Sequence, residues 1–170
     1  MALGPYNVLF LCTGNSARSI IAEALLNRFG EGRFRAFSAG SHPKGQVHPL
    51  ALRLLHERGL PTDGLRSKSW NEFAVAGSPS MDLVVTVCDN AAGEVCPIWP
   101  GQPITAHWSF QDPAAVEGTE PERLRAFERV ARELEARIRL LAALRLDEFD
   151  RDNLKQRLDG IRPGGPEEEQ

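Results

Sequence analysis

A cysteine and an arginine separated by five residues form the first group in this chain that could carry out covalent chemistry. Cys12 and Arg18 flank a loop of small and polar residues, 13–17. An apolar run precedes the loop and a helical pattern follows it, so we expect a strand that turns directly into a helix. The first N–H groups of a helix lack partners, and the helix dipole favours negative charge there. The loop therefore predicts an anion site.

The same field would make Cys12 a nucleophile, because it lowers the pKa of a thiol and favours the thiolate. Arg18 offers a planar fork that grips a tetrahedral oxyanion with two parallel bonds. A hydroxyl at Ser19 can steady the thiolate by donating a hydrogen bond. The expected oxyanion-binding residues are Thr13, Gly14, Asn15, Ser16, Ala17, Arg18 and Ser19.

The alternative for Cys12 is a buried apolar residue, the commoner role of a lone cysteine after a strand. Gly14 and Asn15 lower the weight of that alternative because both tolerate a tight or left-handed backbone. Ser16 and Ala17 leave room for an anion. The Gly-Lys-Ser/Thr ending of a nucleotide-binding loop is missing. We therefore interpret the loop as a cradle for a small oxyanion.

Composition excludes several classes of protein. A chain of 170 residues with 42% apolar residues most simply makes one globular domain. The net charge of −3 argues against a nucleic-acid partner, and no apolar run approaches the length of a membrane span. The N-terminus lacks the pattern of a secretory signal. Three cysteines, an odd number, suit free thiols in the cytoplasm rather than a secreted disulfide framework.

The elements that must position the loop alternate between strand and helix, which predicts an α/β fold with a parallel sheet. The expected strands are 8–11, 33–38, 83–87 and 104–108, and the expected helices include 19–29 and 48–58. Two further helices should open at capping boxes, Ser69 with Glu72 and Thr119 with Glu122. The last helix should bury one face, formed by Phe127, Val130, Ala131, Leu134, Ile138 and Leu141. We expect one domain over 1–160 and a disordered acidic tail over 161–170.

Ligands of parallel sheets bind at the carboxyl ends of the strands. Cys12 and Cys88 each follow an expected strand directly, so both should reach the same edge. Asp112 stands before Pro113, which is a common turn but also a place for a general acid.

The stretch 12–19, Cys-Thr-Gly-Asn-Ser-Ala-Arg-Ser, resembles the phosphate-binding loop of the low-molecular-weight protein tyrosine phosphatase superfamily. The stretch 87–97 contains Cys88 and Cys96. Together with His107-Trp108 and Asp112-Pro113, it is similar to the arsenate reductases of that superfamily, which regenerate through intramolecular disulfides. The likeness extends from about residue 6 to about residue 145.

The resemblance implies a single-domain three-layer sandwich, a four-stranded parallel sheet with helices on both faces. It also implies that arsenate, with phosphate as a competing anion, binds to the loop and that Cys12 attacks the arsenic. Asp112 would protonate the departing oxygen. Cys88 would then release arsenite by forming a disulfide with Cys12, and Cys96 would take that disulfide over. A thioredoxin- or glutaredoxin-type protein would reduce the final disulfide, and no cofactor would be needed.

Two other functions remain open: a phosphatase acting on phosphotyrosine or small phosphate esters, and an oxyanion sensor without catalysis. Reduction of As(V) consumes two electrons, so a second thiol is needed to close a disulfide. The alternative for Cys88 and Cys96 is two unrelated core thiols. Ala114 after Asp-Pro and Ser16 in the loop replace larger residues usual in the phosphatases, which favours a small inorganic oxyanion.

The remaining candidates are assigned supporting roles. The histidines His42, His48, His56 and His107 are interpreted as structural or solvated. A zinc site is not expected, because no Cys-x-x-Cys pair is present. Some relatives bind potassium beside the loop, at positions that correspond to Asn15, Glu23, Ser38 and Asp63. Plain polar support of the loop is the preferred interpretation of these four residues, and a monomer is expected.

Overall fold

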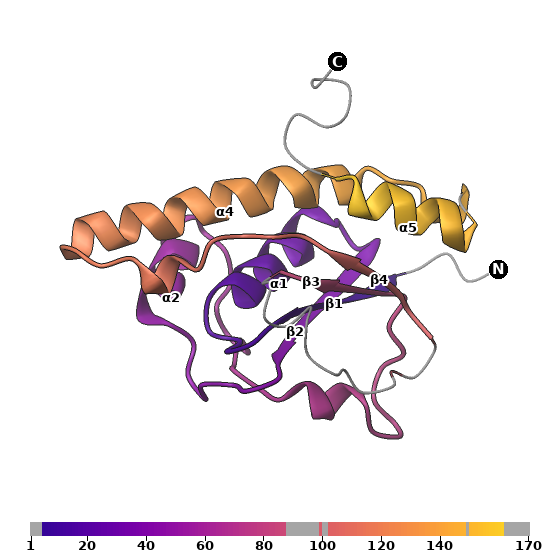
Figure 1. Cartoon of the computed structure of the whole chain (residues 1–170), viewed down its shortest axis with the longest axis horizontal. Helices are drawn as coiled ribbons and strands as arrows, with labels where there is room; N and C mark the ends of the chain where they lie inside the picture. Colours follow the sequence, from indigo (N-terminus) through magenta and orange to yellow (C-terminus); the bar gives the residue numbers. More distant parts are fainter. Residues whose placement is uncertain (1–4, 88–98, 100–101, 149, 162–170) are drawn as a thin grey trace, which may run out of the picture.

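The computed structural model of the chain describes residues 5–87, 99, 102–148 and 150–161, and Cys88, Cys96 and 162–170 lie outside the described residues. Four parallel strands form one sheet in the order β2-β1-β3-β4 (Figure 1). The strands are β1 (Tyr6–Cys12), β2 (Phe34–Gly40), β3 (Leu83–Thr86) and β4 (Ile104–His107). The uninterrupted apolar runs of β1 and β3 suit central strands that are covered on both faces. The predicted four-stranded parallel α/β sheet is confirmed.

Among the described residues, four α-helices pack on one face of the sheet. They are α1 (Arg18–Phe29), α2 (Pro49–Glu57), α4 (Glu120–Ala142) and α5 (Arg151–Asp159), with α4 and α5 along the top of Figure 1. In this layer α1 contacts β1, β2 and α4, so the loop before α1 lies at the carboxyl edge of the sheet. Burial of Ile20, Ile21 and Leu25 fixes the helix on the sheet.

The other face of the sheet is covered, in the described residues, by the 3-10 helix η1 (Trp70–Phe73) and by Trp99. The rings of Trp70 and Trp99 meet edge to face, with centroids 6.2 Å apart. Leu9 and Leu11 of β1 point into this second core cluster. The sheet is therefore buried on both faces.

The helix expected after Ser69 is only a single 3-10 turn. The Ser69 hydroxyl does accept the N–H of Asn71, at 3.1 Å. The second half of the capping box does not form, because the Glu72 carboxylate pairs with Arg66 through two hydrogen bonds of 2.6 and 3.0 Å. Without that support the turn ends at Ala74.

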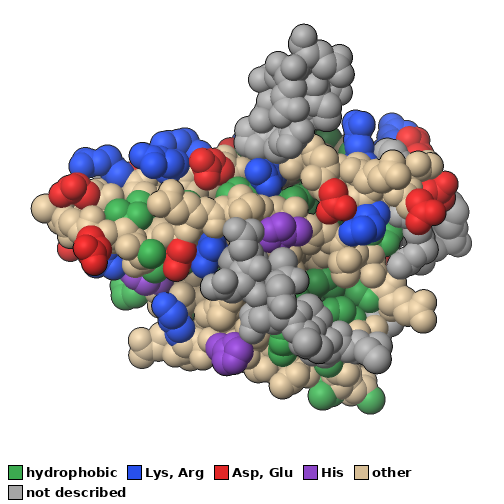
Figure 2. All heavy atoms as spheres, in the orientation of Figure 1, with side chains coloured by type: hydrophobic (Ala, Val, Ile, Leu, Met, Phe, Trp, Pro, Cys, Tyr) green, Lys and Arg blue, Asp and Glu red, His purple; other side chains and the backbone are tan. Residues whose placement is uncertain are grey.

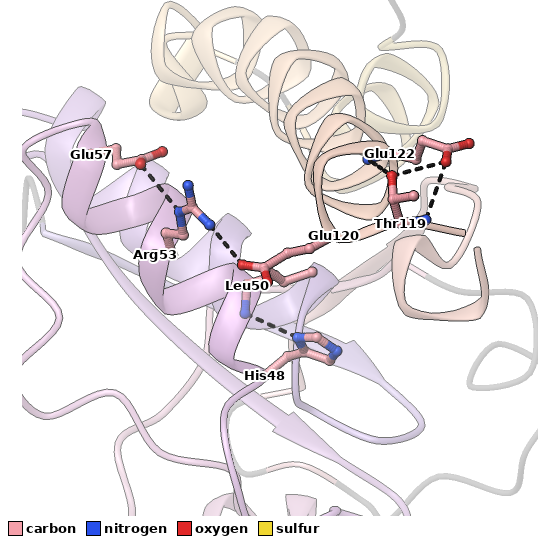
Figure 3. Close-up of polar contacts among 7 residues, drawn as sticks. All are labelled: His48, Leu50, Arg53, Glu57, Thr119, Glu120 and Glu122. Atoms are coloured by element: carbon pink, nitrogen blue, oxygen red, sulfur yellow. Dashed lines mark hydrogen bonds and ion pairs between the residues drawn. The ribbon is translucent and has the colours of Figure 1, made fainter. Parts of the chain in front are cut away.

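The second capping box forms as expected (Figure 3). The Thr119 hydroxyl accepts the N–H of Glu122 at 3.3 Å, and the Glu122 carboxylate accepts the N–H of Thr119 at 3.2 Å. All six apolar residues predicted for the inner face of α4 are buried. Figure 2 shows arginine side chains along the outer face of this helix.

Three elements were not anticipated: η2 (Pro113–Ala115), η3 (Leu146–Glu148) and α5. The last of these packs beside β4, where the indole N–H of Trp108 donates to the carbonyl of Leu158 at 3.0 Å. Ile161 follows α5 and is also buried in the main core. Within the described residues, no helix combines the length and apolarity needed to cross a membrane.

Candidate functional site

The loop between β1 and α1 forms the candidate site at the carboxyl edge of the sheet. Cys12 ends β1 and is 2% exposed, and α1 begins six residues later at Arg18. Asn15, with φ of 44°, adopts the left-handed conformation that lets the chain turn this tightly. No side chain caps the start of α1 at Ala17. The N–H groups of the first turn therefore face the loop, where an anion can accept from them.

Three side chains of this loop form a directed set of hydrogen bonds. The oxygen of the Asn15 amide accepts the N–H of Lys68 at 2.8 Å, which turns the NH₂ group toward Ser19. That group donates to the Ser19 hydroxyl at 2.8 Å. The same hydroxyl lies 3.1 Å from the sulfur of Cys12. Since a thiolate has no proton to give, Ser19 must be the donor when Cys12 is ionised.

Arg18 is held from across the pocket. One guanidinium nitrogen donates to the carbonyl of Phe110 at 3.0 Å, and another lies 3.7 Å from the Asp112 carboxylate. The Asp112 carboxylate also accepts the N–H of Ala114 at 3.0 Å, which fixes its place at the start of η2. An acid and a fork of donors therefore face the same space as Cys12.

These groups line a pocket of about 230 Å³. Cys12, Arg18 and Asp112 all reach it, as the sequence predicted. Its remaining walls come from Thr13, Gly14, Ser16 and Ala17 and from His42 and Lys44. Asn15 and Ser19, which the sequence also placed at the oxyanion, are fully buried and do not line the pocket. A volume of this size suits a small tetrahedral oxyanion.

His42 and Lys44 were not expected at the site. Both lie directly after β2, and the rule that placed Cys12 at the carboxyl edge applies equally to them. Their N–H groups donate to the carbonyls of Thr13 and Gly14 at 2.9 and 3.0 Å. The connection after β2 therefore braces the cysteine loop.

His48 and His107 support the structure, as expected. The Nδ1 atom of His48 accepts the N–H of Leu50 at 3.1 Å and caps α2 (Figure 3). The ring packs on Phe127 with centroids 4.7 Å apart. Burial lowers the pKa of His48, and the positive charges of Arg123 and Lys44 lower it further. His107 makes a 2.7 Å hydrogen bond with Thr86.

Cys88 and Cys96 are outside the described residues, but the strand that leads to them is described. Leu11 of β1 pairs with Thr86 of β3, and the N–H of Val87 donates to the Leu11 carbonyl at 2.8 Å. Val87 therefore lies beside the end of β1, where Cys12 stands. Cys88 is the next residue in the sequence.

Comparisons with known proteins agree with this geometry. The low molecular weight phosphotyrosine protein phosphatase family matches residues 7–155. An arsenate reductase of Halalkalibacterium halodurans is 37% identical over 135 residues, 79% of this chain and 94% of that protein. The arsenate reductase of Bacillus subtilis is 35% identical over the same shares of the two chains.

Solved structures give the same result. The arsenate reductase of Archaeoglobus fulgidus superposes with a TM-score of 0.65 at 32% identity, covering 81% of this chain and 99% of that one. A thioredoxin-dependent arsenate reductase of Corynebacterium glutamicum gives a TM-score of 0.62 at 29% identity, covering 88% of this chain and 66% of that one.

Proposed function

The chain belongs to the low molecular weight phosphotyrosine protein phosphatase family, and on that premise we propose that it is an arsenate reductase driven by a thiol relay. The observation that carries the proposal is the convergence of Cys12, Arg18 and Asp112 on one small pocket. The two sequence relatives described above, which each match 79% of the chain, are arsenate reductases. Ala114 follows Asp112-Pro113 without an aromatic side chain to grip an aryl ester, which fits a small substrate.

In the first step the Cys12 thiolate attacks arsenate held by the N–H groups of the loop and by Arg18. A bond forms between sulfur and arsenic, and one oxygen leaves. Asp112 gives that oxygen its proton, so it departs as water. Ser19 donates to the sulfur before the attack and holds it in line with the pocket.

In the second step the Cys88 thiolate attacks the sulfur of Cys12. The sulfur–arsenic bond breaks, its electron pair stays on arsenic, and As(III) leaves as arsenite. Cys96 then attacks Cys88, which frees Cys12 and leaves a Cys88–Cys96 disulfide. The pairing of Leu11 with Thr86 supports this exchange, because it brings the residue before Cys88 beside the end of β1.

An external dithiol of the thioredoxin or glutaredoxin type returns the two electrons, and arsenate and that dithiol are the partners we propose. The thioredoxin-dependent relative from Corynebacterium glutamicum favours the thioredoxin type. Thiols that must be reduced after each turnover fit a reducing compartment, which supports the cytoplasm as the site of action.

The test is arsenate-dependent oxidation of NADPH in the presence of thioredoxin and thioredoxin reductase. We expect turnover with the native chain, none with Cys12→Ser, and a single turnover with Cys96→Ser that stops at a Cys12–Cys88 disulfide. Mass spectrometry of the arsenate-treated protein identifies the pair. The proposal would be refuted if arsenate were reduced neither with thioredoxin and its reductase nor with glutathione and glutaredoxin.

A phosphatase is the second candidate, since the same cradle accepts phosphate. A low molecular weight protein tyrosine phosphatase of T. tengcongensis superposes with a TM-score of 0.64 at 25% identity, covering 82% of this chain and 99% of that one. A phosphatase needs Cys12 but not Cys88. Full biological activity of Cys88→Ser would favour it over the reductase.

A further inference from the structure

A cluster of polar groups lies behind the cysteine loop, on the side away from the oxyanion pocket. Lys68 is its centre and is only 8% exposed, which is unusual for a lysine. Its backbone N–H donates to the Asn15 side chain at 2.8 Å. Its ammonium group donates to the carbonyl of Ser38 at 2.9 Å. One residue therefore holds both the loop and the end of β2.

The cluster also contains a carboxylate. The hydroxyl of Ser38 donates to Glu23 of α1 at 2.6 Å. Burial raises the pKa of Glu23, while the hydrogen bond from Ser38 and the charge of Lys68 lower it. Burial lowers the pKa of Lys68, and the charge of Glu23 raises it. Each of the two charges offsets part of the desolvation cost of the other.

The cluster is connected to the nucleophile through the hydrogen bonds already described. Lys68 fixes the orientation of the Asn15 amide, that amide donates to Ser19, and the Ser19 hydroxyl reaches the sulfur of Cys12. No other described contact of the Asn15 oxygen would set the amide in this orientation. The donor to Asn15 is the backbone N–H of Lys68, and the ammonium group anchors this same residue to the Ser38 carbonyl. Loss of the ammonium group therefore frees the backbone segment that orients the Asn15 amide, and through Asn15 and Ser19 it reaches the sulfur.

Some members of the resembled family bind potassium at positions that correspond to Asn15, Glu23, Ser38 and Asp63, and the donor set of this chain does not fit that ion. The Asn15 oxygen accepts an N–H, and the Ser38 carbonyl accepts an ammonium group. Asp63 is exposed. An ammonium group carried by the chain itself thus binds an oxygen that the cation would need, the carbonyl of Ser38.

We propose that Lys68 is a positioning residue that supplies an internal cation behind the loop, so that Asn15 and Ser19 stay aligned on Cys12 without a bound metal ion. This inference rests on the proposed function only where it concerns the turnover of arsenate. The alignment itself is a property of the thiol and can be measured without arsenate.

A hollow of about 550 Å³ opens next to the cluster and is lined by Glu23, Ser38 and Lys68, among others. Truncation of Lys68 would extend this hollow to the Ser38 carbonyl and the Glu23 carboxylate. A small cation from solution would then have a path to the position of the missing ammonium group. This makes chemical rescue a direct test of the role of the charge.

The experiment measures the rate of alkylation of Cys12 by iodoacetamide, read by mass spectrometry on the peptide that carries it. In Lys68→Ala we expect alkylation at neutral pH to slow about 10-fold or more, because a displaced Asn15 amide no longer holds Ser19 on Cys12 and the thiolate loses its hydrogen bond from that hydroxyl. Ethylammonium should restore part of the rate, and tetramethylammonium, which cannot donate, should not. The native chain should respond equally to sodium and potassium salts.

Lys155→Ala is the matched control. Lys155 also donates its ammonium group to a backbone carbonyl, that of Thr105 at 2.6 Å, but it does so on the surface near β4. Its removal should leave the alkylation rate unchanged. Lys68→Met, which keeps the apolar stem and the backbone N–H, serves if the alanine variant does not fold by circular dichroism.

Alkylation at the native rate in a folded Lys68→Ala or Lys68→Met would overturn the inference. Slow alkylation that no small cation restores, or a native chain that requires potassium over sodium, would overturn it too. A native chain that fails to reduce arsenate but shows the expected alkylation results refutes the proposed function and leaves this inference standing.

Discussion

At the scale of single residues, Asp112 and His48 each cap a helix and also carry a second property that a substitution can test separately. Asp112 caps η2 through the N–H of Ala114 and also faces Arg18 across the pocket. His48 caps α2 and rests on Phe127. In both cases asparagine can keep the cap while removing the carboxyl group or the imidazole ring.

Asp112→Asn should lower the turnover number for arsenate by about 10²–10⁴-fold, because the departing oxygen loses its proton donor. The fold should persist, since the asparagine oxygen still accepts from Ala114. The measurement is steady-state arsenate reduction with the reductant in excess. Asp150→Asn is the control, because Asp150 caps α5 in the same way, at 2.8 Å from the N–H of Asn153, away from Cys12. Equal activity of the two variants would remove Asp112 from the mechanism.

His48→Asn should change how stability depends on pH. The pKa of His48 is lowered in the folded protein, mainly by burial, from an ordinary value of 6.5. At a pH below 6.5 but above the lowered pKa of the folded protein, His48 binds a proton in the unfolded chain and not in the folded one. The native protein therefore loses stability as pH falls through 6.5. The free energy of unfolding of His48→Asn should not fall in this way as the pH is lowered. Urea unfolding over a pH series measures it, and parallel curves for the two proteins would contradict the prediction.

At the scale of elements, the end of β2 controls the shape of the cysteine loop. A Cβ added to Gly40 would lie 2.5 Å from the carbonyl oxygen of Thr13 and 2.8 Å from that of Cys12. Both are backbone atoms, so the loop must move. Gly40→Ala should therefore lower the free energy of unfolding by about 1–3 kcal/mol and lower arsenate turnover with it. Urea unfolding and the turnover assay measure the two effects, and native values of both would show that the loop yields without cost.

Elements with strong local signals could be predicted from the sequence. The helix α4 has a capping box and six apolar residues at helical spacing, and it forms as expected. The 3-10 turn at Trp70–Phe73 carries the same box, but Arg66 competes for the acidic member. The short α5 has few buried residues, Leu154 and Leu158 among them, so its amphipathic pattern is weak. The competition of Arg66 for Glu72 and the weak burial of α5 depend on tertiary packing, and the spacing of residues in the sequence does not reveal them.

The same distinction applies to the candidate site. Cys12, Arg18 and Asp112 could be identified because each lies in a short motif with its own chemistry. His42 and Lys44 follow β2, so the same carboxyl-edge rule could have placed them, but Lys68 could not be identified, since its position depends on how a distant connection packs against the loop. A residue that supports the cysteine loop from outside its motif can be identified only from the three-dimensional structure.

At the scale of the whole molecule, an anion that binds only the folded state must stabilise it. Phosphate at about 100 times its dissociation constant should raise the free energy of unfolding by about 2.7 kcal/mol. Arg18→Lys should lose much of this gain, because an ammonium group cannot reproduce the two-bond fork. Urea unfolding in sodium phosphate and in sodium chloride of equal ionic strength measures the difference.

Arg53→Lys is the matched control for that experiment. Arg53 pairs with Glu57 and Glu120 on the half-exposed surface between α2 and α4 (Figure 3). Exposed pairs of this kind contribute little to stability. The control should keep the full phosphate effect. An equal effect in Arg18→Lys would mean that phosphate does not bind at the loop.

The hydrogen bond from Arg18 to the carbonyl of Phe110 joins positions 92 residues apart. A ribosome that adds about 5–20 residues per second needs roughly 5–20 s to make that interval. Throughout this time the nascent polypeptide already carries its nucleophilic sulfur but not the carboxyl group or the far wall of the pocket. A nascent chain that stops before Phe110 and Asp112 therefore lacks one wall of the pocket, and the site that we propose for arsenate closes only after these residues have been made.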